Sequence, residues 1–201
     1  MTTSDAGSPA SQPGTTDPAQ DVAAAARDAV VRLTTVVPDF PKPGIAFQDL
    51  TPVFADAAAF RRVVDAISVP FVGAFDVVAG VEARGFLLAA AVAYSTGTGV
   101  VAVRKAGKLP RAVIRESYDL EYGRAALEIH EADLAPGTRV LVLDDVLATG
   151  GTLTAACALL ERAGAVVVGC GVVLELAELD GRAGLADRSV HAVHSVGHAP
   201  R

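Results

Sequence analysis

Two neighbouring carboxylates stand at the end of an apolar run in the stretch from Arg139 to Leu160, RVLVLDDVLATGGTLTAACALL. The Val and Leu residues before Asp144 and Asp145 predict a buried strand, and the amphipathic residues at the end of the stretch predict a helix. In open α/β sheets, ligands bind beyond the carboxyl ends of the strands. We therefore expect a ligand site in the loop between this strand and this helix.

The loop has the composition of a phosphate cradle. Gly150 and Gly151 let backbone N–H groups approach an anion without interference from a Cβ atom. Thr149 and Thr152 add hydroxyl donors, and the helix that starts here presents unpaired N–H groups and the positive end of its dipole. Such a cradle binds a phosphate without a lysine.

The two carboxylates beside this cradle suggest what else the ligand carries. Asp144 and Asp145 would repel a phosphate unless they served another part of the same molecule. Carboxylate oxygens accept hydrogen bonds from ribose hydroxyls, and they also suit a divalent cation with its waters. The pattern therefore indicates a sugar phosphate, although an Asp pair that only caps a Gly-rich turn is the structural alternative.

Two other nucleotide-binding classes lack their motifs. A P-loop needs Gly-x-x-x-x-Gly-Lys-Ser/Thr, but Gly107-Lys108 is followed by Leu109, and Ala102 stands where the first glycine belongs. A dinucleotide-binding fold needs Gly-x-Gly-x-x-Gly after an early strand, and no early strand is followed by it. Neither class accounts for this sequence.

The elements around the loop alternate between helices and strands. Consecutive Val and Leu in the strands, rather than alternation with polar residues, are typical of a parallel sheet buried on both faces. We expect an α/β fold with a central, mainly parallel sheet flanked by helices. The expected helices are 21–34, capped by Asp21, and 57–67, 86–94 and 152–163; the expected strands are 75–81, 100–104, 125–129, 139–143 and 166–175; a Pro-rich turn covers 38–44.

Composition narrows the class of protein. The 201 residues are 51% hydrophobic and 20% charged with a mean hydropathy of +0.41, which excludes a fully disordered chain. The longest apolar runs are too short to span a bilayer, so no membrane association is expected. A net charge of −6 disfavours binding to nucleic acid. Cys157 and Cys170 stand in apolar settings and are expected to be small buried residues, not a disulfide, in a reducing cytoplasm.

The N-terminus differs from the rest of the chain. Residues 1–20 are rich in Ser, Thr, Pro and Gly and have neither a basic residue nor an apolar core, so they predict a disordered tail, not a secretory signal. We expect residues 21–201 to form one domain. His191, His194 and His198 near the other end are interpreted as surface histidines, because Gly197 interrupts any helix that would align them for a metal.

At this point the sequence resembles a known family. VLVLDDVLATGGT is similar to the phosphoribosyl pyrophosphate (PRPP) signature of type I phosphoribosyltransferases. FPKPGIAFQDLTPVFAD, GVEARGFLLAAAVA, VRKAGKLPRAVIRESYDLEYGRAALEIH and ELAELDGRAGL resemble, in order and spacing, the conserved blocks of the adenine phosphoribosyltransferase family. The resemblance covers nearly everything from Asp21 onward.

The resemblance implies purine salvage, in which adenine and PRPP give AMP and pyrophosphate with Mg²⁺ as cofactor in a homodimeric enzyme. Mg²⁺ would be held mainly by the pyrophosphate, ribose oxygens and water. A phosphoribosyltransferase for another base such as xanthine, or a non-catalytic PRPP-binding regulator, remains as an alternative. The implied PRPP-binding residues are Ala148, Thr149, Gly150, Gly151 and Thr152 for the 5′-phosphate, Asp144 and Asp145 for the ribose hydroxyls, and Arg84, Arg104, Lys105 and Lys108 for pyrophosphate.

The resemblance also assigns the purine end of the site. Glu121 is expected to be the general acid/base at the purine imidazole, and Tyr122 to help a flexible hood, residues 107–123, close over PRPP. Adenine is expected to lie against Phe47, with backbone groups of Ala46 and Gln48 reading its Watson–Crick edge. Gln48 stands where the family often has Arg, which affects base selectivity if its side chain contacts the base. By the same resemblance, Arg104 would reach across the dimer interface.

Overall fold

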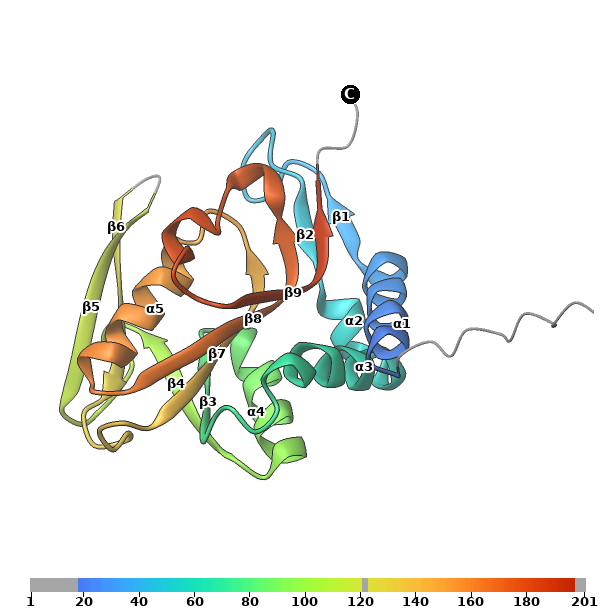
Figure 1. The fold of residues 1–201 in the computed structure, drawn as a ribbon. Coiled ribbons are helices and arrows are strands. Elements are labelled where there is room, and N and C mark those ends of the chain that lie inside the picture. Colours follow the sequence, from blue (N-terminus) through green and yellow to red (C-terminus); the bar gives the residue numbers. More distant parts are fainter. Residues whose placement is uncertain (1–17, 121–122, 198–201) are drawn as a thin grey trace, which may run out of the picture.

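A seven-stranded sheet forms the centre of the protein in the computed structural model, which describes residues 18–120 and 123–197 (Figure 1). The strand order is β5-β6-β4-β3-β7-β8-β9. Strands β4, β3, β7, β8 and β9 run parallel, and the β5–β6 hairpin adds two antiparallel strands at one edge. The strands are β3 Val77–Val81, β4 Gly99–Lys105, β5 Val113–Leu120, β6 Gly123–His130, β7 Arg139–Leu147, β8 Val166–Leu176 and β9 Val190–Val196.

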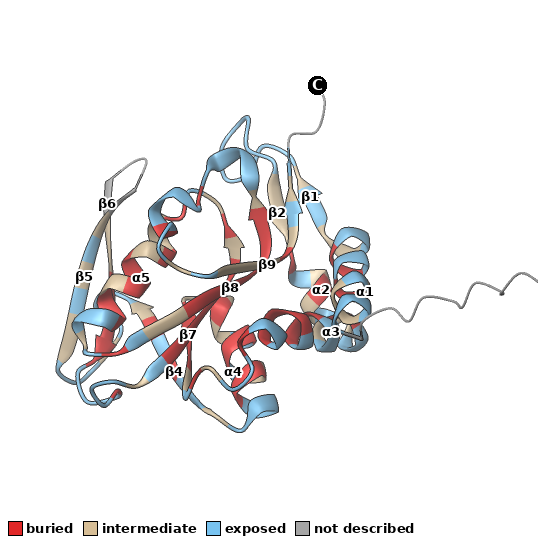
Figure 2. Ribbon diagram, in the orientation of Figure 1, coloured by how far each residue is buried: buried red, intermediate tan, exposed pale blue. Residues whose placement is uncertain are grey.

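Helices cover both faces of this sheet, as the sequence predicts. Helices α1 (Pro18–Leu33), α3 (Ala57–Ser68) and α4 (Gly85–Thr96) lie over one face, and α5 (Gly151–Arg162) lies over the other. In β7, Leu141 and Leu143 join the first core, whereas Val140 and Val142 join the second. Figure 2 shows buried stretches, in red, along the central strands. Burial on both faces explains the unbroken apolar run of β7.

A second, two-stranded sheet lies beside the main one. Strands β1 (Thr35–Val37) and β2 (Phe47–Asp49) pair antiparallel, with the predicted Pro-rich turn between them. The short helix α2 (Thr51–Ala55) follows β2, and three 3₁₀ turns, η1 (Val69–Phe71), η2 (Ala177–Leu179) and η3 (Ala183–Leu185), complete the elements. None of these short elements was part of the sequence prediction.

The start of the first helix differs from the prediction. Helix α1 begins at Pro18, so Asp21 lies within its first turn and does not cap it. Pro is favoured at the first helical position because its missing N–H would be unpaired there in any case. The last three residues of the predicted tail are therefore helical, and the rest of that tail lies outside the described residues.

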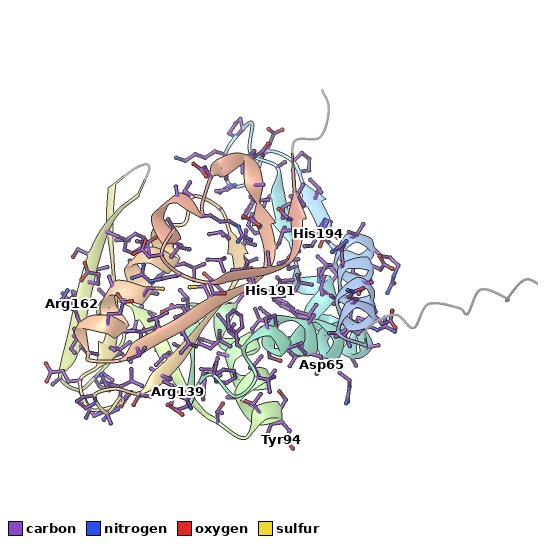
Figure 3. The ribbon with its side chains drawn as sticks, in the orientation of Figure 1. Asp65, Tyr94, Arg139, Arg162, His191 and His194 are labelled. Atoms are coloured by element: carbon purple, nitrogen blue, oxygen red, sulfur yellow. The ribbon has the colours of Figure 1, made fainter. Side chains whose placement is uncertain are left out.

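The segment predicted to be a hood loop, residues 107–123, is mostly a strand. Strand β5 occupies Val113–Leu120 and pairs residue for residue with β6. Arg162 of α5, labelled in Figure 3, forms an ion pair with Glu116 and donates a hydrogen bond of 3.0 Å to the carbonyl of Arg115. The sequence prediction contained no strand here, because long-range pairing with β6 organises a segment whose polar residues resemble those of a loop.

Strand β7 also extends further than predicted, through the two carboxylates to Leu147. Its pairing with β3 ends at Leu143, whereas its pairing with β8 continues to Leu147. One side of β7 is therefore hydrogen-bonded beyond Leu143 while the side that faces β3 is not. This one-sided extension is what opens a space beside Asp144 and Asp145.

The structure can be compared with the prediction for the two cysteines, and its helices can be compared with the length of a membrane span. Cys157 and Cys170 are free and buried, with their Sγ atoms 3.5 Å apart, which confirms the prediction of small buried residues. Within the described ranges, no helix combines the length and the apolar character needed to cross a membrane.

A buried carboxylate fixes the turn between β4 and β5. Glu128 of β6 is 1% exposed, and its Oε1 accepts hydrogen bonds from the backbone N–H groups of Lys108 (2.8 Å) and Leu109 (3.1 Å). Its Oε2 accepts a bond of 3.2 Å from Arg115. Burial would raise the pKa of Glu128, but these donors and the N–H of Gly107 outweigh burial and lower this pKa to about 2.

We predict that Glu128→Gln lowers the free energy of unfolding at pH 7 by about 2 kcal/mol, because an uncharged amide accepts these bonds more weakly. Since the pKa falls from 4.5 in the unfolded chain to about 2 in the folded one, the stabilisation is complete above the higher value and is lost as pH falls toward the lower one. Urea unfolding of both proteins between neutral and acidic pH measures the difference. The exposed Glu131→Gln is the control, and a difference that does not shrink on acidification contradicts the prediction.

Candidate active site

The predicted phosphate cradle is a small concave site at the end of β7. A cavity of about 80 Å³ is lined by Asp144, Val146 and the continuous run 147–153. Gly150 has φ of +81°, a left-handed conformation that favours glycine, and it precedes the first turn of α5. No side chain caps that turn, so its N–H groups remain available to an anion. The structure thus brings Ala148, Thr149, Gly150, Gly151 and Thr152 together, as expected.

A larger cavity of about 510 Å³ adjoins the cradle. The two share four lining residues, which makes them neighbouring parts of one cleft at the carboxyl end of the sheet. Such a volume suits a small-molecule ligand. The larger cavity is lined by Glu82, Ala83 and Arg84 before α4, Lys105 of β4, Tyr118 of β5, Ala125 and Leu127 of β6, Asp144, Asp145 and Val146 of β7, and Ala148 and Thr152 of the cradle.

The two carboxylates of β7 are buried where the cavities meet. Asp144 is 9% and Asp145 5% exposed, and the backbone N–H of Asp145 donates to Oδ1 of Asp144 at 2.9 Å. Burial, and then the charge of Asp145, raise the pKa of Asp144 well above its ordinary value. Burial also raises the pKa of Asp145, although the nearby Arg84 opposes this. The pair is an uncommonly concentrated set of buried acceptors.

Arg84 connects these carboxylates to the predicted base-binding region. Its Nε forms an ion pair with Oδ2 of Asp145 at 2.6 Å, and this buried oxygen has no hydrogen-bond partner among the described residues. Its guanidinium lies over the ring of Phe47, 5.4 Å from the centroid, and Phe40 packs edge-on against the same ring at 5.1 Å. Phe47 therefore lies beside Arg84, which lines the larger cavity.

Strand β2 directs Gln48 away from this region. Successive side chains alternate across a strand, so Phe47 and Asp49 share one face and Gln48 takes the other. Gln48 lines a separate cavity of about 190 Å³ beside α1 and β9, and its Nε2 donates to the carbonyl of Ala46 at 3.5 Å. The side chain of Gln48 is not part of the cleft, and Ala46 is exposed.

The predicted basic residues are only partly brought together. Lys105 lines the larger cavity, but Arg104 and Lys108 do not. Nε of Arg104 donates to Oε2 of Glu82 at 3.2 Å, and its guanidinium lies over the ring of Phe86. Lys108 is exposed, and its backbone is held by a carboxylate of β6. In a single chain, Arg84 and Lys105 are thus the cations of the cleft among the described residues.

Two polar residues of the cleft carry no role in the sequence prediction. Tyr118 lines the larger cavity, and Oγ1 of Thr152 donates to its hydroxyl at 3.4 Å. Glu82 accepts a hydrogen bond of 2.9 Å from the backbone N–H of Lys105 and thereby orients the end of β4. The alternation of apolar and polar residues around Tyr118 is the signal that could have identified β5. Glu121 and Tyr122 lie outside the described residues.

The C-terminal histidines do not converge. His191 and His194 of β9, both labelled in Figure 3, line two separate cavities beside α1. His191 lines a cavity with Ala66 and Pro70, whereas His194 lines the cavity that contains Gln48. Burial lowers the pKa of both. His198 lies outside the described residues.

Comparisons with known proteins identify the family. Residues 57–196 match the model of the phosphoribosyl transferase domain. Adenine phosphoribosyltransferase of Renibacterium salmoninarum is 66% identical over 164 residues, which covers 82% of this chain and 90% of the relative.

Two solved structures extend this similarity to the fold. The structure of adenine phosphoribosyltransferase from Rhodothermus marinus matches with a TM-score of 0.82 and 44% identity. The matched region covers 86% of this chain and 99% of that enzyme's chain. The enzyme from Saccharomyces cerevisiae, in complex with D-2,5-dideoxy-2,5-imino-altritol 1,6-bisphosphate and adenine, has a TM-score of 0.81 and 34% identity, and covers 85% of this chain and 99% of its own. The chain belongs to the adenine phosphoribosyltransferase family.

Proposed function

We propose that this protein transfers the 5-phosphoribosyl group from PRPP to adenine and releases AMP and pyrophosphate. The observation that carries the proposal is one cleft that joins a phosphate cradle of backbone amides to buried carboxylates and a cationic cavity. A sugar that is phosphorylated at one end and pyrophosphorylated at the other fits this order of groups. The yeast relative with bound adenine supports adenine as the acceptor.

Each part of PRPP has a matching part of the cleft. The N–H groups and hydroxyls of residues 148–152 would bind the 5′-phosphate, and Asp144 and Asp145 would accept hydrogen bonds from the ribose 2′- and 3′-hydroxyls. Arg84 and Lys105 would neutralise the pyrophosphate as it departs. A ribose hydroxyl that donates to Oδ2 of Asp145 would give this buried oxygen a hydrogen-bond partner.

The reaction exchanges one bond at C1 of the ribose for another. The bond between C1 and the pyrophosphate oxygen breaks with its electron pair going to pyrophosphate, and N9 of adenine supplies the pair for the new bond to C1. The proton of the purine imidazole must leave, and we assign Glu121 as the base that accepts it. The β5–β6 hairpin, together with Tyr122, would exclude water from the activated sugar.

We propose that a magnesium ion binds in this cleft as part of the substrate complex. Among the residues that the structure describes, no three His, Cys, Asp or Glu side chains gather as a metal cage. Asp144 and Asp145 are the carboxylates beside the larger cavity that could share an ion or its waters with the ligand. Mg²⁺ bound to pyrophosphate and ribose oxygens would reduce the negative charge of the leaving group.

Free buried thiols agree with a cytoplasmic location.

Base selectivity would depend on the backbone of the segment before α2. Phe47 offers a ring for adenine, and the backbone of Ala46 and Gln48 would bind its Watson–Crick edge. The Gln48 side chain lines a different cavity. The replacement of the Arg often found in the family by Gln48 therefore leaves the backbone groups of Ala46 and Gln48 available to bind the base.

The proposed activity is tested with a panel of bases. With PRPP and Mg²⁺, we expect adenine to be preferred over hypoxanthine, guanine and xanthine by at least about 100-fold in kcat/KM, because backbone groups that pair with an exocyclic amine are left unpaired by the other bases. Pyrophosphate release is the measurement, and chelation of Mg²⁺ should abolish it. Faster turnover of xanthine would establish the xanthine alternative, and PRPP binding with no turnover of any base would establish the regulator.

The assignment of Glu121 gives a second prediction. Glu121→Gln should lower kcat about 100-fold, because the amide cannot accept the purine proton. KM for PRPP should change little, since the residue is proposed to act on the base. Glu131→Gln is the matched control at an exposed carboxylate outside the cleft. An unchanged kcat in Glu121→Gln would remove this residue from the mechanism.

We also propose that the protein is a homodimer that associates through α4 and β4. The sequence of α4, GFLLAAAVAYST, is apolar around its whole circumference, which is typical of a helix buried on all sides. Yet Leu87 is 54% and Tyr94 92% exposed on α4, and Val100 of β4 is 53% exposed. Figure 3 shows Tyr94 at the outer end of α4. Arg104, on the same strand as Val100, would then lie where it could reach a partner's site.

We predict that the wild-type protein has a solution mass of twice the 20.4 kDa chain and that Tyr94→Arg is monomeric. The reason is that an arginine buried without a partner in an apolar interface costs several kcal/mol. Light scattering after size exclusion measures both masses. Val166→Arg places the same charge on an exposed valine of β8 and should leave the dimer intact. A monomeric wild type, or a dimeric Tyr94→Arg, contradicts this interface.

A further inference from the structure

The chain after β8 packs directly against the phosphate cradle. A Cβ atom on Gly150 would lie 2.1 Å from the carbonyl oxygen of Gly181, and a Cβ atom on Gly181 would lie 2.1 Å from that of Ala148. Both distances are far below a van der Waals contact, so the two backbones touch where neither residue has a side chain. We call residues 177–185 the buttress; Figure 1 shows it in orange-red above α5.

Further contacts extend this packing along the start of α5. Oγ1 of Thr154 donates to the carbonyl of Gly184 at 3.2 Å. Leu185 is 1% exposed and belongs to the same core as Leu147 and Leu153, which flank the cradle. No residue of the buttress lines either described cavity of the cleft. The buttress thus supports the cradle without facing the ligand.

One side chain ties the buttress to the sheet. Nε and Nη2 of Arg182 donate to the two carboxylate oxygens of Glu175 at 2.5 and 2.9 Å, and Nη1 donates to the carbonyl of Val190 at 2.9 Å. Glu175 is 7% exposed and pairs in register with Leu147, the residue directly before the cradle. Arg182 therefore joins the end of β8 to the start of β9 and closes the buttress between them.

From this geometry we infer that Arg182 and Glu175 are positioning residues for the 5′-phosphate of PRPP, acting through Gly181 on the cradle. The inference rests on the proposed function for the identity of the ligand. Arg182 is adjacent in sequence to Gly181, whose backbone meets Ala148 and Gly150. A guanidinium fork held by a buried carboxylate allows little movement, and cradle donors need placement to within a fraction of an ångström.

The experiment compares Arg182→Lys and Arg182→Met with wild type. Lysine keeps the charge but cannot form the bidentate pair. We expect KM for PRPP, and Kd for ribose 5-phosphate measured by calorimetry, to rise about 10-fold or more in both, and further in Arg182→Met. KM for adenine and Kd for pyrophosphate should stay near wild type, because neither ligand uses the cradle. A purely structural role would instead lower stability without this selective loss.

The matched control is Arg188→Met. Arg188 pairs with Glu161 near the far end of α5, so its loss removes a comparable ion pair without touching the cradle. Melting temperatures of all variants separate lost stability from lost affinity. If Arg182→Met fails to fold, Gly181→Ala gives the second measurement, since its methyl group would push directly against the carbonyl of Ala148.

The outcomes distinguish this inference from the proposed function. If the wild-type protein turns over adenine but Arg182→Lys and Gly181→Ala bind ribose 5-phosphate as tightly as wild type, the inference is overturned. The proposed function then still stands. Equal losses for ribose 5-phosphate, pyrophosphate and adenine also overturn the inference. Wild type that fails to turn over adenine overturns the function, whereas a selective loss of ribose 5-phosphate affinity in the variants still supports the positioning role.

Discussion

The buried pair Asp144 and Asp145 imposes the main physical constraint on this protein. Two carboxylates withdrawn from water side by side are costly, and their raised pKa values reflect that cost. The fold compensates from one direction: Arg84 pairs with Asp145, and the N-terminus of α4 lies against Asp144, since a Cβ atom on Gly85 would be 3.2 Å from Oδ1. A positive helix end and a guanidinium thus lie on one side of acceptors that a sugar ligand would satisfy.

Close backbone approach is the means by which the fold achieves this arrangement. A Cβ atom on Gly85 would also lie 2.6 Å from the carbonyl of Leu143, so α4 can touch β7 only because residue 85 has no side chain. The same device recurs on the other side of the site, where Gly150 meets Gly181. The cleft is therefore bounded by two contacts that a single methyl group would disturb, and each brings backbone dipoles to a ligand-binding loop.

The local chemistry of the site is largely readable in the sequence, because it is contained in one continuous segment. The apolar run of β7, the adjacent carboxylates and the Gly-Gly turn predicted both the strand and the cradle before α5. What depends on pairing between distant segments was missed: β7 continues past Asp145 because β8 extends beside it, and β5 is a strand because β6 pairs with it.

The orientation of individual side chains is likewise set by tertiary neighbours. Gln48 faces away from the cleft because β2 pairs with β1 and thereby fixes which side chains face which way. Tyr118 reaches Thr152 only because β5 packs on α5. Glu175 lies in β8 and Arg182 in the turn after it, so they share neither a strand nor a helix, and their contact follows from the turn between β8 and β9.

Helix α4 shows how a dimer and a cleft would depend on one another. Its first residues approach Leu143 and Asp144, its inner face packs on β3 and β7, and its outer face exposes Leu87 and Tyr94. A partner that covers the outer face would limit the movement of the whole helix, including the turn that holds Arg84. Because Arg84 lies within 2.6 Å of Asp145, a shift of α4 by even a fraction of that distance changes the electrostatics of the buried pair. Association would then stabilise the geometry that the ligand requires, which gives a physical reason for an apolar helix to lie between the subunit surface and the reacting groups.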